Sequence, residues 1–262
     1  MRIIVVVGRV LDPQGISVNR RRGLLFVNRE EYLMQPADRC ALEAALRIRD
    51  AMDAEVVTLP RIPLPDDDVL RQALSAGADR ALNIVGEACA GADDAAMTPV
   101  LAAAIERLGG ADLLLTGART LDSGQSQLGA RMAEAMGWPQ ILDAWRVEVV
   151  DGHVRSVQHR AGEYVAVEVP LPAVVTIAPG ALKPRYPNGP RLISVYSAED
   201  AVEQWAVTDL VSQAALQPTL QVLDKDFPAE RERGTRMGGT AEEMGHELAG
   251  LLGRKVMRGR RA

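Results

Sequence analysis

The sequence predicts an α/β protein with a mainly parallel, doubly wound sheet, a β-hairpin insertion and an extended C-terminal arm. Three observations predict this class. The first 140 residues alternate short β-branched runs with segments of helical period, three strand-like runs follow, and signals are weak from residue 197 to about 226. Apolar residues make up 47% of the 262 residues and charged residues 25%, which is typical of a folded globular chain.

The parallel part of the sheet is predicted from four successive strand–helix units. Residues 3–7 form a continuous β-branched run, as in a strand buried on both faces. Residues 36–49 follow with an apolar helical stripe, and Asp38 is the expected helix starter. Units of this kind repeat along the chain and favour parallel pairing. The other expected strands cover 55–59, 81–85 and 112–116, and the other expected helices cover 66–77, 96–108 and 125–136.

The second half of the chain predicts an antiparallel insertion and an arm. Strand-like runs cover 146–150, 154–158 and 164–169, and the Asp151-Gly152 pair predicts a hairpin turn. A further buried strand is expected at 173–177, a short helix near 198–205 and an amphipathic helix at 241–252. We therefore expect one α/β domain over residues 1–195 and an arm over 196–262 that needs a partner surface.

Charge and composition exclude several classes of function. The chain has 30 basic and 35 acidic residues, a net charge of −5, and five of the basic residues lie in the last nine positions. The rest of the chain is therefore strongly acidic, which argues against general nucleic-acid binding. Two cysteines and three scattered histidines lack metal-ligand spacing, so no metal site is expected. Without a secretory signal or an apolar run of 18 residues, the sequence predicts a cytoplasmic protein.

Ligand-binding positions are expected beyond the carboxyl ends of the parallel strands, at 8–14, 60–65, 86–94 and 117–127. The last segment is rich in small and polar residues and leads into a helix, whose N-terminal N–H groups suit a phosphate. An equally good interpretation is that Ser123 caps the helix and Gly117 turns the chain. Neither a Walker loop nor a GxGxxG motif is present.

The sequence contains no catalytic constellation. No serine occupies a GxSxG elbow, and Cys40 lies within an apolar helix stripe, so it is expected in the core. The three acids at 66–68 are expected to interact with a helix dipole rather than with a cation. We predict no catalytic residues.

Six segments, in this order, resemble the beta subunit of electron transfer flavoproteins. The resemblance covers residues 1–192 and continues weakly to the end. It implies an adenine-nucleotide alpha hydrolase-like fold. The segments are VVVGRVLDP (5–13), MQPADRCALEAALRIRD (34–50), LRQALSAGADRAL (70–82), DLLLTGARTLDSGQSQLGARMAEAMGWPQ (112–140), VPLPAVVTIAPG (169–180) and KPRYPNGP (183–190).

The resemblance implies a non-catalytic subunit of a heterodimer. An alpha subunit would hold most of an FAD, and the pair would carry electrons from flavin dehydrogenases to a quinone reductase or another acceptor. The beta subunit would bury an AMP, or a second FAD as in bifurcating relatives. Reasoning from the residues leaves open a different function, a stand-alone nucleotide-binding enzyme of the same superfamily.

The resemblance also implies particular site residues. Gln35 stands where the family usually has Asn, Gly8 stands where it usually has Lys, and only Asp122, Gln127 and Gly129 match its phosphate loop. Arg9 would pair with a phosphate or a partner's acid, or form a plain surface ion pair. The implied nucleotide-binding residues are Val6, Arg9, Gln35, Pro36, Ala37, Asp38, Arg61, Gly117, Ala118, Arg119, Thr120, Leu121, Asp122, Ser123, Gly124, Gln125, Ser126, Gln127 and Leu128. The implied docking residues for a dehydrogenase are Ala181, Leu182, Lys183, Arg185 and Tyr186, with Leu182 as an apolar anchor; a rigid turn is the alternative for this segment.

Overall fold

The computed structural model describes residues 1–86, 92–212, 216, 218–224, 226–227, 234 and 236–259, with side chains described as far as residue 253. The chain divides into two units, Met1–Leu223 and Asp224–Ala262. The expected loop at 86–94 is therefore described only in part, and the side chains of the basic tail lie outside the described residues.

The larger unit is built on a nine-stranded sheet in the order β11-β10-β9-β12-β8-β1-β6-β7-β13. The strand β1 lies between β6 and β8 and pairs with both in parallel. This mostly parallel sheet confirms the predicted fold class. Its central strands are β1 (Arg2–Val7), β6 (Glu55–Pro60), β7 (Arg80–Val85), β8 (Leu113–Gly117) and β12 (Ala173–Ile177).

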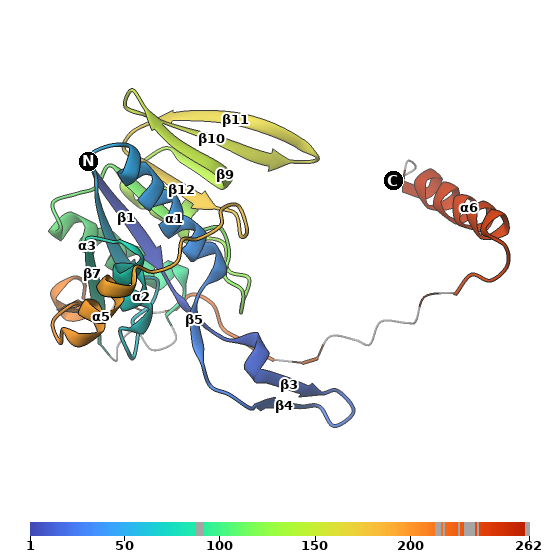
Figure 1. The fold of residues 1–262 in the computed structure, drawn as a ribbon, viewed down its shortest axis with the longest axis horizontal. Coiled ribbons are helices and arrows are strands. Elements are labelled where there is room, and N and C mark those ends of the chain that lie inside the picture. The colour runs from blue at the N-terminus through green and yellow to red at the C-terminus, as the bar shows by residue number, and fades with distance from the viewer. Residues whose placement is uncertain are drawn as a thin grey trace. The chain divides into compact units, whose positions relative to one another are not determined.

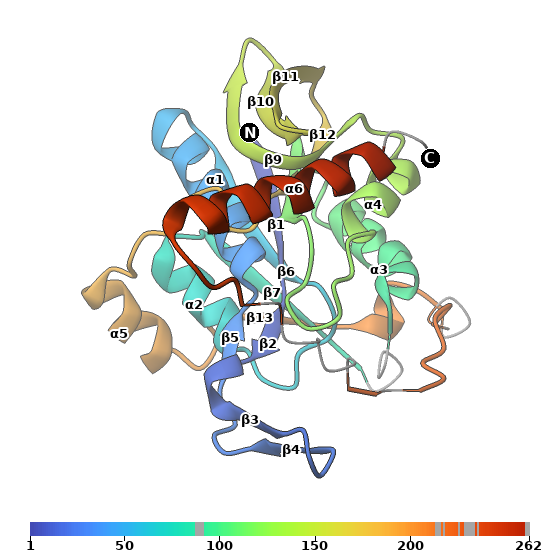
Figure 2. The ribbon, with the colours of Figure 1, turned by 90° about the vertical axis from the view of Figure 1, so that its right-hand side faces the viewer.

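Helices cover both faces of this sheet (Figure 2). Ile3, Val5 and Val7 of β1 belong to a core shared with α1 and α2, whereas Ile4 and Val6 belong to a core shared with α3 and α4. Because alternate residues of β1 enter different cores, both of its faces must be apolar, which explains the β-branched run. The four expected strand–helix units are confirmed, with helices α1 (Pro36–Ala51), α2 (Asp68–Ala76), α3 (Asp94–Arg107) and α4 (Leu128–Met136).

Three antiparallel strands extend the sheet beyond β12, and they confirm the predicted hairpin insertion. The long strand β9 (Gln140–Val150) begins as a parallel partner of β12 and ends as an antiparallel partner of β10 (His153–Arg160). The strand β11 (Glu163–Pro170) completes the set. Asp151 and Gly152 have φ of 50° and 76°, the two positive values that a type I′ turn requires.

The segment after residue 188 differs from the sequence prediction. The expected helix near 198–205 is wrong, because the helix α5 (Gly189–Ser197) ends before that region. The region instead contains strand β13 (Glu203–Ala206), which pairs in parallel with β7. A 3₁₀ turn at Val207–Asp209 follows. The compact unit therefore continues past residue 195 to Leu223. Hydrogen bonds from Arg191 to the carbonyl of Leu74 (2.6 Å) and from Arg71 to that of Val195 (2.5 Å) join α5 to α2.

A long hairpin after β1 is absent from the sequence prediction. The expected ligand loop at 8–14 instead continues into strand β2 (Arg9–Leu11) and a 3₁₀ turn at Pro13–Gly15. Strands β3 (Ile16–Asn19) and β4 (Leu24–Val27) form a two-stranded ribbon, and β5 (Tyr32–Met34) returns alongside β2. The ribbon projects away from the rest of the larger unit (Figures 1 and 2).

The described part of the C-terminal unit contains one helix, α6 (Ala241–Gly259), which confirms and lengthens the expected helix at 241–252. Its start is a capping box, because the N–H of Thr240 donates to Glu243 Oε2 (2.8 Å) and the N–H of Glu243 donates to Thr240 Oγ1 (3.3 Å). Within the part of the chain that is described, no helix is long and apolar enough to cross a membrane.

Candidate functional site

The candidate site lies where the connections of the sheet change direction. From β1 the chain passes through α1 to β6 on one side, whereas β8, on the other side of β1, leads into α4 on the opposite face. In doubly wound sheets, ligands bind beyond the carboxyl ends of the strands at such a point. The residues that follow these strands are Gly8, Arg61 and Ala118.

Asp38 joins the ends of the two strands at this point. Its carboxylate accepts a hydrogen bond from the N–H of Gly8 and another from the N–H of Gly117, each of 2.8 Å, and the residue is only 1% exposed. The expectation that Asp38 starts α1 is wrong, because Gln35 precedes the helix and the Asp38 side chain is used across the sheet. The N–H groups of Gly8 and Gly117 are therefore engaged within the protein.

The environment of Asp38 shifts its acidity. Burial raises the pKa of its carboxyl from 3.8 to about 6, although the Arg61 charge and the two N–H donors act in the opposite direction. Burial dominates because it removes the charged form from water.

This shift predicts a pH dependence of stability. The unfolded chain ionises Asp38 near pH 4 and the folded chain only near pH 6, so this group is expected to lose about 2 kcal/mol of stabilising free energy as the pH rises from 4 to 6. Urea unfolding of the parent chain and of Asp38→Asn at both pH values measures it. Because the variant cannot titrate at this position, its stability relative to the parent should rise by that amount. A difference that stays constant with pH would contradict the prediction.

Arg61 and Asp94 form a buried ion pair beside Asp38. Arg61 Nη2 lies 2.9 Å and 2.8 Å from the two carboxylate oxygens of Asp94, and Nε lies 3.2 Å from Oδ1. Each residue is 5% exposed. The third guanidinium nitrogen, Nη1, is buried and has no hydrogen-bond partner among the described residues. A buried donor without a partner is costly, so it marks a place where a ligand oxygen would be favourable.

Gln35 positions the loop at 117–127 against β1. Its side-chain oxygen accepts from the N–H of Leu121 (2.9 Å), and its side-chain nitrogen lies 3.4 Å from Asp122 Oδ1. Within the loop, Thr120 Oγ1 accepts from the N–H of Gln125 (3.1 Å) and lies 2.9 Å from Ser123 Oγ. Many of the loop's donors are thus used internally.

The loop does not supply a cap for α4. The helix begins at Leu128, later than the expected 125, and Gln127 precedes it without a side-chain capping bond. Ser123 instead donates its backbone N–H to Asp122 (2.7 Å), so its expected alternative role as a helix cap is wrong. The positive end of the α4 dipole therefore carries no acidic cap, which favours an anion there.

Other predicted binding residues differ in how far their side chains are buried. The side chain of Val6 is fully buried in the core with α3 and α4, Ala37 is 2% exposed, and Pro36 is on the surface. Arg9 donates to Asp66 Oδ2 (2.7 Å) and its guanidinium lies 4.0 Å from the centre of the Tyr32 ring. Arg9 thus forms the surface ion pair that was its alternative role.

Two hollows adjoin the start of α4. A cavity of about 100 Å³ lies between the beginning of α3 and the loop, and it includes Asp93, Gln125, Thr219 and Leu220 in its lining. A more open groove of about 650 Å³ runs between α3 and α4, past Thr98, Ser126 and Arg131. The cavity is smaller than the roughly 300–1,000 Å³ of ligand pockets, whereas the groove is within that range. Residues 87–91, which precede α3, lie outside the described part of the chain.

The predicted docking segment packs along α1. Arg185 donates from Nε to Glu43 (2.9 Å) and from Nη2 to Asp50 (2.8 Å), which raises its own pKa and fixes the segment on the helix. Leu182 is half-buried against the core, and its carbonyl accepts from the Cys40 thiol (3.3 Å). Tyr186, by contrast, is 87% exposed.

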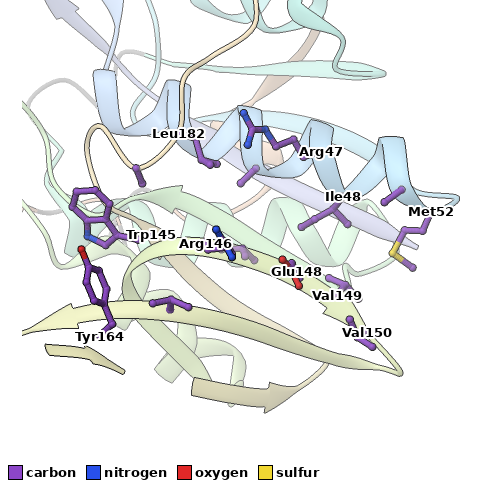
Figure 3. Close-up of a pocket in the computed structure, with 15 residues that line it drawn as sticks. Arg47, Ile48, Met52, Trp145, Arg146, Glu148, Val149, Val150, Tyr164 and Leu182 are labelled. Carbon is purple, nitrogen blue, oxygen red and sulfur yellow. The ribbon is translucent and has the colours of Figure 1, made fainter. Parts of the chain in front are cut away.

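Ala181 and Leu182 also line a hollow of about 970 Å³ between α1 and the antiparallel strands. In Figure 3, Trp145 and Tyr164 lie together at one end of it and Met52 lies at the other. Trp145 is 41% exposed and Tyr164 is 77% exposed. The sequence prediction did not include either aromatic residue, because their position beside α1 depends on the pairing of β9 with β10 and β12, which has no local signal.

Comparisons with known proteins identify the family. The model of the electron transfer flavoprotein domain matches residues 23–210. The chain belongs to the electron transfer flavoprotein family, in its beta-subunit group. It is 30% identical to the caffeyl-CoA reductase-Etf complex subunit CarD of Acetobacterium woodii, over 98% of each chain. It is 30% identical to the electron transfer flavoprotein subunit beta of Clostridium acetobutylicum (80% of each chain) and 32% identical to the protein FixA of Azorhizobium caulinodans (77% of this chain and 76% of that protein).

Membership confirms the resemblance inferred from the sequence motifs. An electron transfer flavoprotein subunit works in electron transport together with a flavin, and this much holds for the chain. The match ends at residue 210, in the segment just after β13, so the family domain includes the strand that completes the sheet.

Proposed function

We propose that this chain is the non-catalytic beta subunit of a heterodimeric electron transfer flavoprotein. An alpha subunit holds most of the FAD, and the pair carries electrons from a flavin dehydrogenase to a quinone reductase or a similar acceptor. The observation that carries the proposal is the family match over residues 23–210. The flavin supplies the redox chemistry when bound, and this chain supplies position and electrostatics.

The C-terminal unit fits a role on the surface of the alpha subunit. Leu248, Leu251 and Leu252 of α6 are 47%, 41% and 55% exposed and are spaced to share one face of the helix. An apolar face of this kind gains stability by packing on another chain. We therefore propose that the C-terminal unit, residues 224–262, packs on the alpha subunit.

The carboxyl edge of the sheet would hold an AMP. Its phosphate would lie at the start of α4, where the helix carries no acidic cap, and Arg61 Nη1 would donate to a ligand oxygen. Asp38 would not touch the ligand, because its carboxylate already binds Gly8 and Gly117. Asp38 would instead hold the two strand ends at the spacing that the nucleotide needs.

The heterodimer experiment tests this proposal. The chain is co-expressed with a flavin-bearing alpha subunit from the same organism, the complex is purified, and released nucleotides are identified by mass spectrometry. We expect one FAD and one AMP per heterodimer. A chain that purifies alone without flavin and hydrolyses ATP would overturn the proposal and favour a stand-alone nucleotide-binding enzyme.

The same complex tests the docking of the dehydrogenase. We propose that the docking segment, residues 181–186, receives the donor together with the aromatic end of the adjoining hollow, because Tyr186, Tyr164 and Trp145 are exposed and aromatic residues are common interface anchors. Tyr186→Ala should retain the flavin and accept electrons at least about tenfold more slowly at low donor concentration. The control Ile193→Ala removes another largely exposed apolar side chain (70% against 87% for Tyr186) from α5 and should leave the rate unchanged. If the two variants accept electrons at the same rate, the donor dehydrogenase docks on another surface.

A second FAD in place of the AMP is an alternative that one observation favours. Two full-length relatives have names that place them with CoA-ester reductases: the CarD subunit, and the acryloyl-CoA reductase electron transfer subunit gamma of Anaerotignum propionicum, which is 26% identical over 97% of this chain. Two FAD molecules and no AMP in the purified heterodimer would establish this bifurcating type. The open groove beside α4 offers more room than a single phosphate needs.

A further inference from the structure

The ribbon of β3 and β4 has one entirely apolar face. The register pairs Ile16 with Val27 and Val18 with Leu25, and directly paired residues lie on the same face of a hairpin. Val18, Leu25 and Val27 are 47%, 55% and 47% exposed. The rest of the described chain therefore leaves this face uncovered.

The base of the ribbon is fixed rather than loose. The carbonyl of Gly15 accepts from the N–H of Asn28 (2.8 Å), and the N–H of Asp12 donates to the carbonyl of Glu31 (2.8 Å). A Cβ atom on Gly15 would lie 2.2 Å from the carbonyl oxygen of Arg29, so only glycine permits this close approach. The ribbon is thus held as a projecting arm (Figure 1).

The arm is basic, although the chain is acidic. Residues 13–29 contain four arginines and no acidic residue, in a chain whose net charge is −5. Three of these arginines, at positions 20–22, form the tip between β3 and β4 and are exposed. Charge complementarity therefore favours a partner that has acidic side chains opposite the tip.

The unpaired edges of the ribbon favour a protein partner over a lipid surface. Among the described residues, β3 and β4 pair only with each other, so each has an outer edge of free N–H and C=O groups. Such groups are costly in hydrocarbon, whereas a protein can supply hydrogen bonds to them. A second copy of the chain is also disfavoured at this face, because two arms in contact would bring the same arginine-rich sequence together.

The position of the arm indicates which protein it meets. The strands at its base, β2 and β5, are flanked by Gly8 and Gln35, which are hydrogen-bonded to each other. Gly8 also donates to Asp38, and Gln35 accepts from the loop at 117–127. A partner chain that covers this ligand-binding edge of the sheet therefore also lies beside the base of the arm. We propose that the β3–β4 ribbon is a docking arm whose apolar face, formed by Ile16, Val18, Leu25 and Val27, seats in an apolar groove of the flavin-bearing alpha subunit, with acidic groups of that subunit opposite residues 20–22. This inference rests on the proposed function.

The test measures dissociation of the purified heterodimer on dilution by mass photometry. The double variant Val18→Asp/Leu25→Asp should raise the dissociation constant at least about tenfold. The matched control Ser17→Asp/Asn19→Asp adds the same charge to the other face of β3 and should change it less than about twofold. Thermal unfolding of each variant chain shows whether the larger unit stays folded, which we expect because the arm lies outside both cores.

A second variant tests the charge contribution. Arg21→Ser/Arg22→Ser should slow association and weaken its dependence on salt, because steering between opposite charges is screened by salt. If the parent heterodimer forms and Val18→Asp/Leu25→Asp binds as tightly, the docking arm is overturned and the proposed function stands. If the apolar-face variant loses binding only to anionic vesicles or only to a donor dehydrogenase, the assignment to the alpha subunit is overturned. If the parent chain itself binds no flavin-bearing subunit, both the function and the arm are overturned.

Discussion

Replacing Arg61 with alanine is expected to destabilise the larger unit by about 3–5 kcal/mol. The Asp94 carboxylate would remain buried, at 5% exposure, without the two Nη2 contacts and the Nε contact that now neutralise it. An unpaired charge in such a place is among the costliest changes to a fold. Urea unfolding followed by circular dichroism measures the loss.

A second ion pair provides the control for Arg61. Arg80 binds Glu203 through Nε (2.9 Å) and Nη2 (3.1 Å), but the two side chains are 37% and 41% exposed. Arg80→Ala should therefore cost less than about 1 kcal/mol, since exposed pairs contribute little. The double variant Arg61→Met/Asp94→Leu should recover much of the loss, because it removes both charges and keeps apolar volume. A loss below about 1 kcal/mol in Arg61→Ala would contradict the buried-pair interpretation.

Gly117→Ala is the second change with a large expected effect. A Cβ atom at this position would lie 2.4 Å from Asp38 Oδ1, 2.6 Å from the Cβ of Ala37 and 2.8 Å from the backbone nitrogen of Asp38. The start of α1 must therefore move away from β8, and the bond between the Gly117 N–H and Asp38 is lost. We expect a destabilisation of about 3–4 kcal/mol, because overpacking adds to the loss of a hydrogen bond to the buried Asp38 carboxylate.

The control for Gly117 is a glycine with open space. A Cβ atom on Gly189, at the first residue of α5, meets no heavy atom within 4 Å. Gly189→Ala should change the unfolding free energy by less than about 0.5 kcal/mol in either direction. If the heterodimer forms with Gly117→Ala, it should also have lost its AMP. Full stability and full AMP content in that variant would show that the carboxyl edge tolerates movement of α1.

Local sequence signals predicted the alternating part of the fold. The run at residues 3–7 and the helical stripe at 36–49 each specify an element by themselves, because burial on two faces or on one stripe dictates the residue types. The Asp151-Gly152 turn is likewise a local property, since two positive φ angles suit few residue pairs. These elements could be predicted without knowing which segments they pack against.

Other elements depended on partners far away in the chain. A signal for α5 was present, because Asn188 caps the helix by accepting from the N–H of Arg191 (3.2 Å) and Pro190 lies in its first turn, but the same residues also suit a tight loop. The four-residue strand β13 is too short for a periodic pattern and exists because it pairs with β7. The β3–β4 ribbon has no core of its own, so only the connections at its base define it.

The sequence by itself determined the family and the order of the strand–helix units, and it predicted a ligand at the carboxyl edge of the sheet. The tertiary structure decided what each residue does there. Asp38, which the sequence suggested as a helix cap, binds an N–H group 79 residues away, and Arg61 is neutralised by an acid 33 residues away. Periodicity records only whether a side chain is buried, whereas hydrogen bonds and ion pairs arise when strands from distant parts of the chain end side by side.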